Sequence, residues 1–183
     1  MSLPALEADC GQCAALCCFL LPFDKSDAFA FDKAGGEPCR HLNTDFRCDI
    51  HDKLDARGCS GCVRFDCHGA GQRVVQDLFA GQNLRDAPQL MDRMGEAFRR
   101  MRRVHELLVL LREAGRLPLG EAKEAERQAI LKLLNPPEDW SEASLASFDI
   151  AGAEKNVTHF LTSLRDVVEP GNVTPEANRA ISG

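Results

Sequence analysis

The residues best suited to chemistry in this 183-residue chain are its nine cysteines, which all lie within the first 67 residues. They are Cys10, Cys13, Cys17, Cys18, Cys39, Cys48, Cys59, Cys62 and Cys67. Thiolate is a soft, strong donor, and four thiolates in a tetrahedron select Zn²⁺ or iron. The segregation of the cysteines therefore predicts that any metal chemistry belongs to the N-terminal part of the chain.

Two Cys-x-x-Cys turns supply half-sites, Cys10 with Cys13 and Cys59 with Cys62. Such a turn puts two sulfur atoms on the same side of a tight loop, and paired knuckles of this kind are typical of zinc. The run from Cys10 through Cys13 to Cys17 instead places three thiolates in one loop, as in [4Fe–4S] proteins. The spacing leaves both occupants open, one or two zinc ions or an iron–sulfur cluster, and favours zinc slightly.

The adjacent Cys17 and Cys18 limit how the sulfur atoms can be shared. Successive side chains diverge, so we expect them to serve two different metals, or one to bind metal and the other to enter the core. Eight sulfur atoms would fill two four-ligand sites. Three histidines beside cysteines could each replace a sulfur, although a surface or supporting position is the commoner role: His41, His51 and His68.

Composition and charge exclude several classes of protein. The chain is 44% hydrophobic and 27% charged, as soluble globular proteins are. Its longest apolar run, residues 107–111, is far shorter than the roughly 20 residues that span a bilayer. A formal net charge of -6 argues against nucleic-acid binding as the main task. No basic region precedes an apolar stretch at the N-terminus, so we expect no secretory signal, a cytoplasmic location and reduced thiols.

The hydrophobic pattern divides the chain into three parts. Residues 1–71 sustain no helical period, so we expect loops with short strands or turns wrapped on metal. Residues 72–170 predict a helical bundle, and residues 171–183 a flexible tail or linker. The predicted fold class is mainly α, with a small irregular, cysteine-rich, metal-stapled N-terminal module packed on a helical bundle.

Apolar residues that recur at spacings of three and four identify the helices. Four are expected, at about residues 72–79, 88–114, 120–134 and 151–168. For the longest one, Asp86 is the expected N-cap and Gly115 the expected end. The apolar stripes of the three longer helices can cover each other in a small antiparallel bundle.

The opening run CGQCAALCC at residues 10–18 and the later stretch from Cys39 to Cys67 together carry a family resemblance. They resemble the cysteine-rich N-terminal region of certain bacterial pentapeptide-repeat proteins, over roughly residues 8–115. The opening run alone is also similar to a broader bacterial CxxCxxxCC family described as zinc- or iron-chelating. The pentapeptide repeats themselves are absent from this sequence, so we transfer nothing that the family owes to its repeats.

Position by position, the resemblance implies eight metal-cluster residues, namely Cys10, Cys13, Cys17, Cys18, Cys39, Cys48, Cys62 and Cys67. It places Cys59 outside the ligand set, where the family more often has an apolar residue. This removes one of the two zinc knuckles and brings an iron–sulfur centre close to parity with zinc.

Three functions are compatible with these patterns. The first is a metal-binding protein with a mainly structural or interaction role, which saturated four-thiolate coordination favours over catalysis. The second is an iron–sulfur redox or radical enzyme or electron carrier, and the third is a metal store or chaperone that exchanges ions through Cys18 and Cys59. No catalytic residue can be assigned from the sequence. A protein partner on the helical region fits all three. The arginines of residues 99–103 could contact phosphate or an acidic partner, but we expect them to form the solvated face of the long helix.

Overall fold

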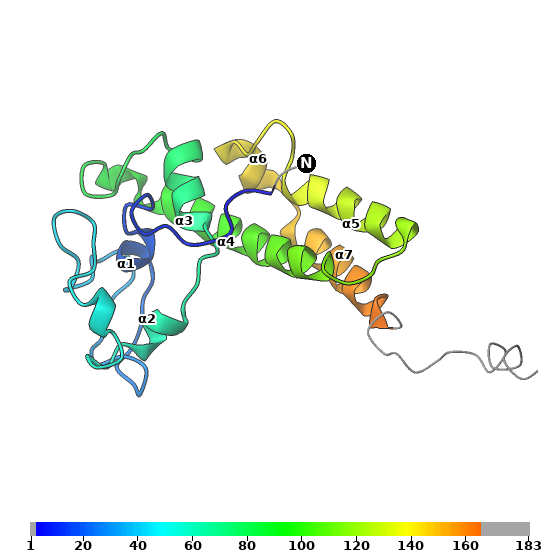
Figure 1. Cartoon of the computed structure of the whole chain (residues 1–183). Coiled ribbons are helices and arrows are strands. Elements are labelled where there is room, and N and C mark those ends of the chain that lie inside the picture. The colour runs from blue at the N-terminus through cyan, green and yellow to red at the C-terminus, as the bar shows by residue number, and fades with distance from the viewer. Residues whose placement is uncertain (1–2, 166–183) are drawn as a thin grey trace, which may run out of the picture.

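A single long helix, α4 (Met91–Ala114), runs through the middle of the structure and contacts elements on both sides (Figure 1). The structure is a computed structural model, and it describes residues 3–165. Within that range the chain forms seven α-helices and no named strand, which confirms the expected mainly α fold.

Helix α4 forms where the sequence shows its strongest helical period. Four of its side chains, spaced by three, four or seven residues, are at most 1% exposed: Met94, Phe98, Met101 and Leu108. Side chains at these spacings lie on one face of a helix, so their burial requires neighbours along most of its length. The neighbours are α1 and α3 from the cysteine-rich part and the three later helices.

The predicted C-terminal end of α4 is confirmed, whereas its predicted N-cap is wrong. Gly115 follows the last helical residue, as expected. The expected N-cap Asp86 is wrong, because the α-helix begins at Met91 and Leu90 holds the N-cap position. The Asp86 carboxylate instead accepts a hydrogen bond from the side-chain amide of Asn83 at 2.8 Å. A 3-10 turn, Pro88–Leu90, follows Asp86 and leads directly into the α-helix.

Three helices pack on α4 to complete the bundle. They are α5 (Glu121–Leu134), α6 (Glu142–Ser147) and α7 (Ile150–Thr162). The sequence predicted α5, and it predicted α7 with a later end. It missed α6, because six residues are too few to show a helical period, but Ser141 and Ser144 start this helix with a reciprocal capping box.

The cysteine-rich part consists of loops joined by short helical segments. They are α1 (Leu16–Leu20), the 3-10 turn η1 (His51–Lys53), α2 (Ser60–Arg64), α3 (Ala70–Arg73) and the π-helical turn η2 (Val74–Leu78). The last two cover most of the helix expected at 72–79. Isolated β-bridges, such as the one between Phe23 and Lys33, take the place of the short strands that were expected.

Two hydrophobic clusters of very different size hold these elements together. The main one extends from Leu6 and Leu16 through α4 to Leu164. The second has only three buried members, Phe31, Ile50 and Cys59, and lies among the loops of the cysteine-rich part. The boundary predicted between residues 71 and 72 falls inside α3, which belongs to the main cluster.

A buried polar network fastens α3 to α4 and to the loop after α5. Arg73, 6% exposed, donates to Nε2 of the fully buried His105 at 3.4 Å and to Oδ1 of Asn135 at 2.9 Å. Because arginine only donates, Nε2 of His105 must accept, and Nδ1 therefore carries the proton that it donates to the His68 carbonyl at 2.6 Å. His105 is thus held neutral, and burial lowers its pKa from 6.5 to about 4.

This network predicts a pH dependence of stability. The unfolded chain takes up the His105 proton near pH 6.5 and the folded chain only near pH 4, so the contribution is complete above 6.5 and is lost as pH falls toward 4. We expect His105→Gln to remove about 3 kcal/mol of the acid-induced loss in unfolding free energy. Denaturant titrations across this range measure it, with the exposed His159→Gln as control. Equal pH slopes for both variants would contradict the assignment.

Two other expectations concern the C-terminal tail and membrane-spanning helices. The predicted tail, residues 171–183, lies outside the described residues. Among residues 3–165 no helix combines the length and the apolar character that crossing a membrane would require.

Candidate metal centre

The Cys10–Cys13 turn is shaped by the residue in front of it. Oδ1 of Asp9 accepts from the Gly11 amide at 2.8 Å, and its Oδ2 accepts from the Gln12 side chain at 2.7 Å. The thiol of Cys13 points back along the turn to the Cys10 carbonyl at 3.6 Å. The Cys-x-x-Cys pair therefore stands in the tight loop that the sequence predicts.

The two thiols of this turn differ in exposure and in acidity. Cys10 is exposed, and a hydrogen bond from Cys13 is the main reason that its pKa is lowered to about 6, helped by the charges of His51 and Arg47. The same bond and then burial raise the pKa of Cys13. The hydrogen bond between the two thiols therefore favours the thiolate form at Cys10 over Cys13.

Cys67 reaches this turn from the other end of the cysteine-rich part. A β-carbon added to Gly71 in α3 would lie 2.9 Å from the Cys13 β-carbon and 3.8 Å from the Cys67 sulfur. It would also lie 3.7 Å from the ring of Phe98 in α4. Only a residue without a side chain allows α3 to bring Cys13 and Cys67 together against the long helix.

We expect Gly71→Ala to disturb this junction. The added methyl would push the Cys13 turn away from α3, and overpacking of this kind costs about 1–3 kcal/mol of unfolding free energy. The measurement is denaturant unfolding followed by circular dichroism. Gly120→Ala is the matched control, because nothing lies within 4 Å of its added β-carbon. Equal losses of unfolding free energy in the two variants would contradict this role of Gly71 in the packing.

A second set of cysteines surrounds the small cluster of Phe31, Ile50 and Cys59. Cys39 and Cys48 pack against this cluster from a short hairpin, closed by a bridge between Leu42 and Cys48. The Cys39 amide donates to the Cys18 carbonyl at 2.9 Å, which ties the hairpin to α1. The structure therefore brings Cys18, Cys39 and Cys48 into one neighbourhood.

Cys59 and Cys62 join this neighbourhood through α2. Cys59 is 2% exposed and its thiol donates to the Arg57 carbonyl at 3.7 Å, whereas Cys62 is exposed. Partial burial, and then the charge of Cys59, raises the pKa of Cys62 to about 11. The family resemblance places Cys59 outside the ligand set, yet Cys59 is a buried member of the cluster against which Cys39 and Cys48 pack. The Cys-x-x-Cys spacing of Cys59 and Cys62 was the sequence signal for this position.

Cys17 and Cys18 lie where the two sets meet. Their sulfur atoms are 4.0 Å apart in α1. The Cys18 thiol raises the pKa of Cys17, followed by burial and the charges of Cys13 and Cys10. A hydrogen bond with Cys17 lowers the pKa of Cys18, against burial and the charge of Cys10. Burial raises the pKa of Cys39, and the charge of Cys18 adds to that effect. Cys18 therefore lies close to both sets.

The nine thiols are all free, and their sulfur atoms do not surround a common point. Within residues 3–165 no group of three or more histidine, cysteine or acidic side chains is arranged to hold one ion. The three candidate histidines also have other contacts. His41 packs edge-on against Phe31, His51 begins a 3-10 turn, and the His68 ring lies 3.3 Å from the Asp66 carboxylate.

Lys33 is a buried cation beside the second set, and the sequence pattern did not identify it. The residue is 7% exposed, and its ammonium group donates to the carbonyls of Phe19, Leu21 and Ala34 at 3.1, 2.8 and 3.1 Å. Burial lowers its pKa, while the charges of Cys39, Cys18 and Cys17 oppose that effect. A lysine in a loop rich in aspartate carries no sequence signal of burial, because lysine is normally exposed.

We expect Lys33→Met to destabilise the fold by about 2 kcal/mol, because carbonyls at the end of α1 lose a charged donor. Urea unfolding followed by circular dichroism measures the loss. The control is Lys53→Met, whose side chain is 63% exposed and for which we expect almost no change. Identical midpoints for the two variants would show that the buried ammonium contributes nothing.

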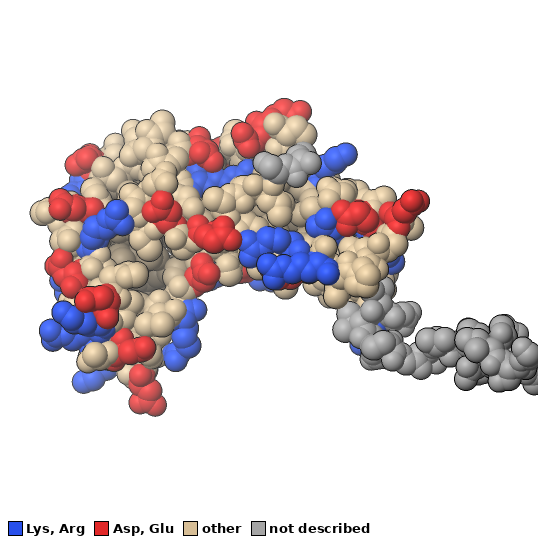
Figure 2. Space-filling model, viewed as in Figure 1, with Lys and Arg blue, Asp and Glu red and all other residues tan. Residues whose placement is uncertain are grey.

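The charged surface is mixed rather than basic, as the interspersed blue and red groups in Figure 2 show. Most arginines of α4 are engaged within the chain. Arg93 pairs with Glu142, Arg103 with Glu154, and Arg100 donates to two carbonyls of the α6 region. This pairing joins α4 to the α6 region and to α7.

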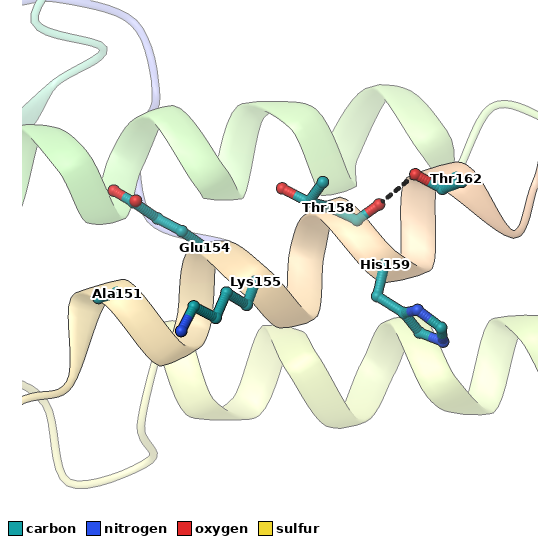
Figure 3. A pocket seen from close by; sticks show the side chains of 6 residues that line it. All are labelled: Ala151, Glu154, Lys155, Thr158, His159 and Thr162. Carbon is teal, nitrogen blue, oxygen red and sulfur yellow. Dashed lines mark hydrogen bonds between the residues drawn. The ribbon is translucent and has the colours of Figure 1, made fainter.

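A shallow hollow lies along α7, the helix that stands between α4 and α5 in Figure 3. Its lining residues all come from this one helix: Ala151, Glu154, Lys155, Thr158, His159 and Thr162. Glu154 is paired with Arg103, and the Thr162 hydroxyl donates to the Thr158 carbonyl at 2.8 Å. Because its groups do not converge from different elements, we assign it no chemistry.

The fold and the thiols define a mainly helical protein with a cysteine-rich N-terminal region. It is similar to a protein of Bacillus subtilis (strain 168) described as uncharacterized protein YybG, with 32% identity over 177 residues. The similarity covers 97% of this chain and 63% of YybG, so the chain spans less than two thirds of its relative. No family model matches the sequence, and no solved structure matches the chain.

Proposed function

We propose that this chain is a metal-binding protein, in which the N-terminal cysteines hold zinc or an iron–sulfur centre with a mainly structural or interaction role. The observation that carries the proposal is that nine free thiols from five separate segments all belong to the loops and short helices of the first 67 residues. Thiols brought together in this way are the donors that zinc and iron select.

The small size of the second cluster supports a structural role for the metal. Phe31, Ile50 and Cys59 are the only buried members of that cluster, and isolated β-bridges supply much of the local backbone pairing. A core of this size contributes little stability by itself, whereas cross-linking by metal contributes binding free energy directly to folding. The metal would replace the apolar core that these loops lack.

The donor chemistry fits such a centre, with one requirement. The sulfur atoms must move toward a common point, because no set of three converges in residues 3–165 as they stand. Exposed thiols such as Cys10 and Cys62 can rotate without displacing core residues. The buried ammonium of Lys33 beside Cys18 and Cys39 suits anionic thiolates rather than neutral thiols.

An iron–sulfur redox protein is the second candidate. It is favoured by the exposed Cys10, which shares one short loop with Cys13 and Cys17 and would leave an edge of a cluster near solvent. A metal store or chaperone, a cytoplasmic location and a protein partner on the helical region remain predictions that accompany the proposal.

The test is elemental analysis together with an absorption spectrum of protein purified without oxygen and under reducing conditions. We expect at least about one zinc or iron per chain, because four-thiolate sites bind these metals tightly. A colourless zinc protein supports the structural role, and visible sulfur-to-iron absorption supports the second candidate. Chelation is expected to lower the thermal unfolding midpoint. Protein that is folded and reduced but free of both metals, and that binds neither on addition, would end the proposal.

A further inference from the structure

The Cys10–Cys13 turn combines one exposed and one buried thiol that are in hydrogen-bond contact with each other. We propose that this turn is a redox-active dithiol that reacts with organic disulfides by thiol–disulfide exchange. In this reaction Cys10 attacks the disulfide, and Cys13 resolves the mixed disulfide that results. This activity goes beyond the proposed metal-binding function and does not depend on it.

The exposure of the two thiols assigns their roles. Cys10 is exposed, so a disulfide can approach its sulfur from solvent. Cys13 is 6% exposed, and its thiol contacts the Cys10 side chain and points to the Cys10 carbonyl at 3.6 Å. A shielded thiol held beside the first sulfur reacts with that sulfur faster than a second external molecule does, because the intramolecular step needs no further encounter.

Contacts on both sides hold the turn in this arrangement. On the outer side, Oδ1 of Asp9 accepts from the Gly11 amide at 2.8 Å. On the inner side, a β-carbon added to Gly71 would lie only 2.9 Å from the Cys13 β-carbon, so Cys13 is packed directly against α3. The buried thiol is therefore fixed by the fold, while Cys10 remains at the surface.

A cation lies beside the turn, where negative charge moves during the exchange. A β-carbon added to Gly11 would lie 2.6 Å from a guanidinium nitrogen of Arg47, so this group packs on the backbone between the two cysteines. Exchange transfers negative charge from the attacking sulfur to the leaving sulfur. A positive charge fixed at this position stabilises that charge as it develops.

Two other cysteine pairs lack this combination of features. Cys59 and Cys62 have the same spacing and one exposed thiol, but the buried Cys59 thiol donates to the Arg57 carbonyl at 3.7 Å. Cys17 and Cys18 have sulfur atoms 4.0 Å apart, and neither residue is exposed. Consecutive Cα atoms are about 3.8 Å apart, which is below the roughly 4.4–6.8 Å that disulfides usually span.

The exchange takes two steps that conserve atoms and electrons. The Cys10 thiolate attacks one sulfur of a disulfide R–S–S–R, forms a Cys10–S–S–R mixed disulfide and releases the first R–S⁻. Cys13 then attacks the Cys10 sulfur, the second R–S⁻ leaves with the proton from Cys13, and a Cys10–Cys13 disulfide remains. Two electrons pass from the dithiol to the external disulfide, and the reverse reaction with thiols restores the reduced turn.

The experiment uses the full chain, reduced and kept with a chelator, and adds an equimolar amount of glutathione disulfide. Samples are quenched with acid over time, alkylated and analysed by peptide mass spectrometry. We expect glutathione to appear first on Cys10, followed by a Cys10–Cys13 disulfide. Cys13→Ser should accumulate the mixed disulfide on Cys10, and Cys10→Ser should lose both products. Cys62→Ser is the matched control, because it removes the exposed thiol of the other Cys-x-x-Cys pair and should leave both products unchanged.

Three results would overturn the inference. They are first modification at a thiol other than Cys10, a mixed disulfide on Cys10 that the wild-type chain never resolves, and resolution by a disulfide between Cys13 and Cys67. The wild-type chain alone shows the order of the products, so the test holds even if circular dichroism finds a serine variant unfolded. Because the chelator keeps metal from the thiols, absence of metal binding and absence of exchange are separate results.

Discussion

Burial of α4 is the constraint on which the rest of the structure depends. A helix whose apolar side chains are buried along its length needs neighbours at both ends, and here they come from both parts of the chain. The contact of Gly71 with Phe98 and the bond from Arg73 to His105 fix α3 on this helix. Through α3, the packing of α4 also fixes where Cys13 and Cys67 meet.

The sequence predicts those features that a repeating pattern encodes locally. The helical period of α4 and α5 was visible because burial selects apolar residues at regular intervals over several turns. Helices α1, α2 and α6 were missed, since five or six residues are too short to show a period. The mainly α fold follows from the long elements alone.

The grouping of the cysteines was less accessible from the sequence, for a different physical reason. Spacing shows which thiols share a turn, but Cys67 meets Cys13 through long-range packing around a glycine. The burial of Cys59 and Lys33 depends likewise on closure of loops that have little regular structure. Such contacts depend on three-dimensional packing, and the spacing of residues in one sequence does not predict them.

The two sets of thiols are anchored with unequal strength. The first rests on the main cluster through Gly71 and α1, so its position is maintained by a large apolar core. The second surrounds a cluster with three buried members. Because fewer apolar contacts oppose local opening there, we expect the hairpin and α2 to open at a lower free energy than the elements packed on α4.

Exposure of one thiol in each set bears on how metal could enter. Cys10 and Cys62 are exposed, while Cys13 is buried and Cys39 and Cys48 are half-buried. Each set therefore has one thiol at the surface, while its other thiols are more enclosed by the fold. An ion or reagent that reacts with thiolates meets Cys10 and Cys62 first, without opening the main core. Under the proposed metal-binding function, a store would therefore differ from a structural protein in the rate of ion release rather than in the identity of its ligands.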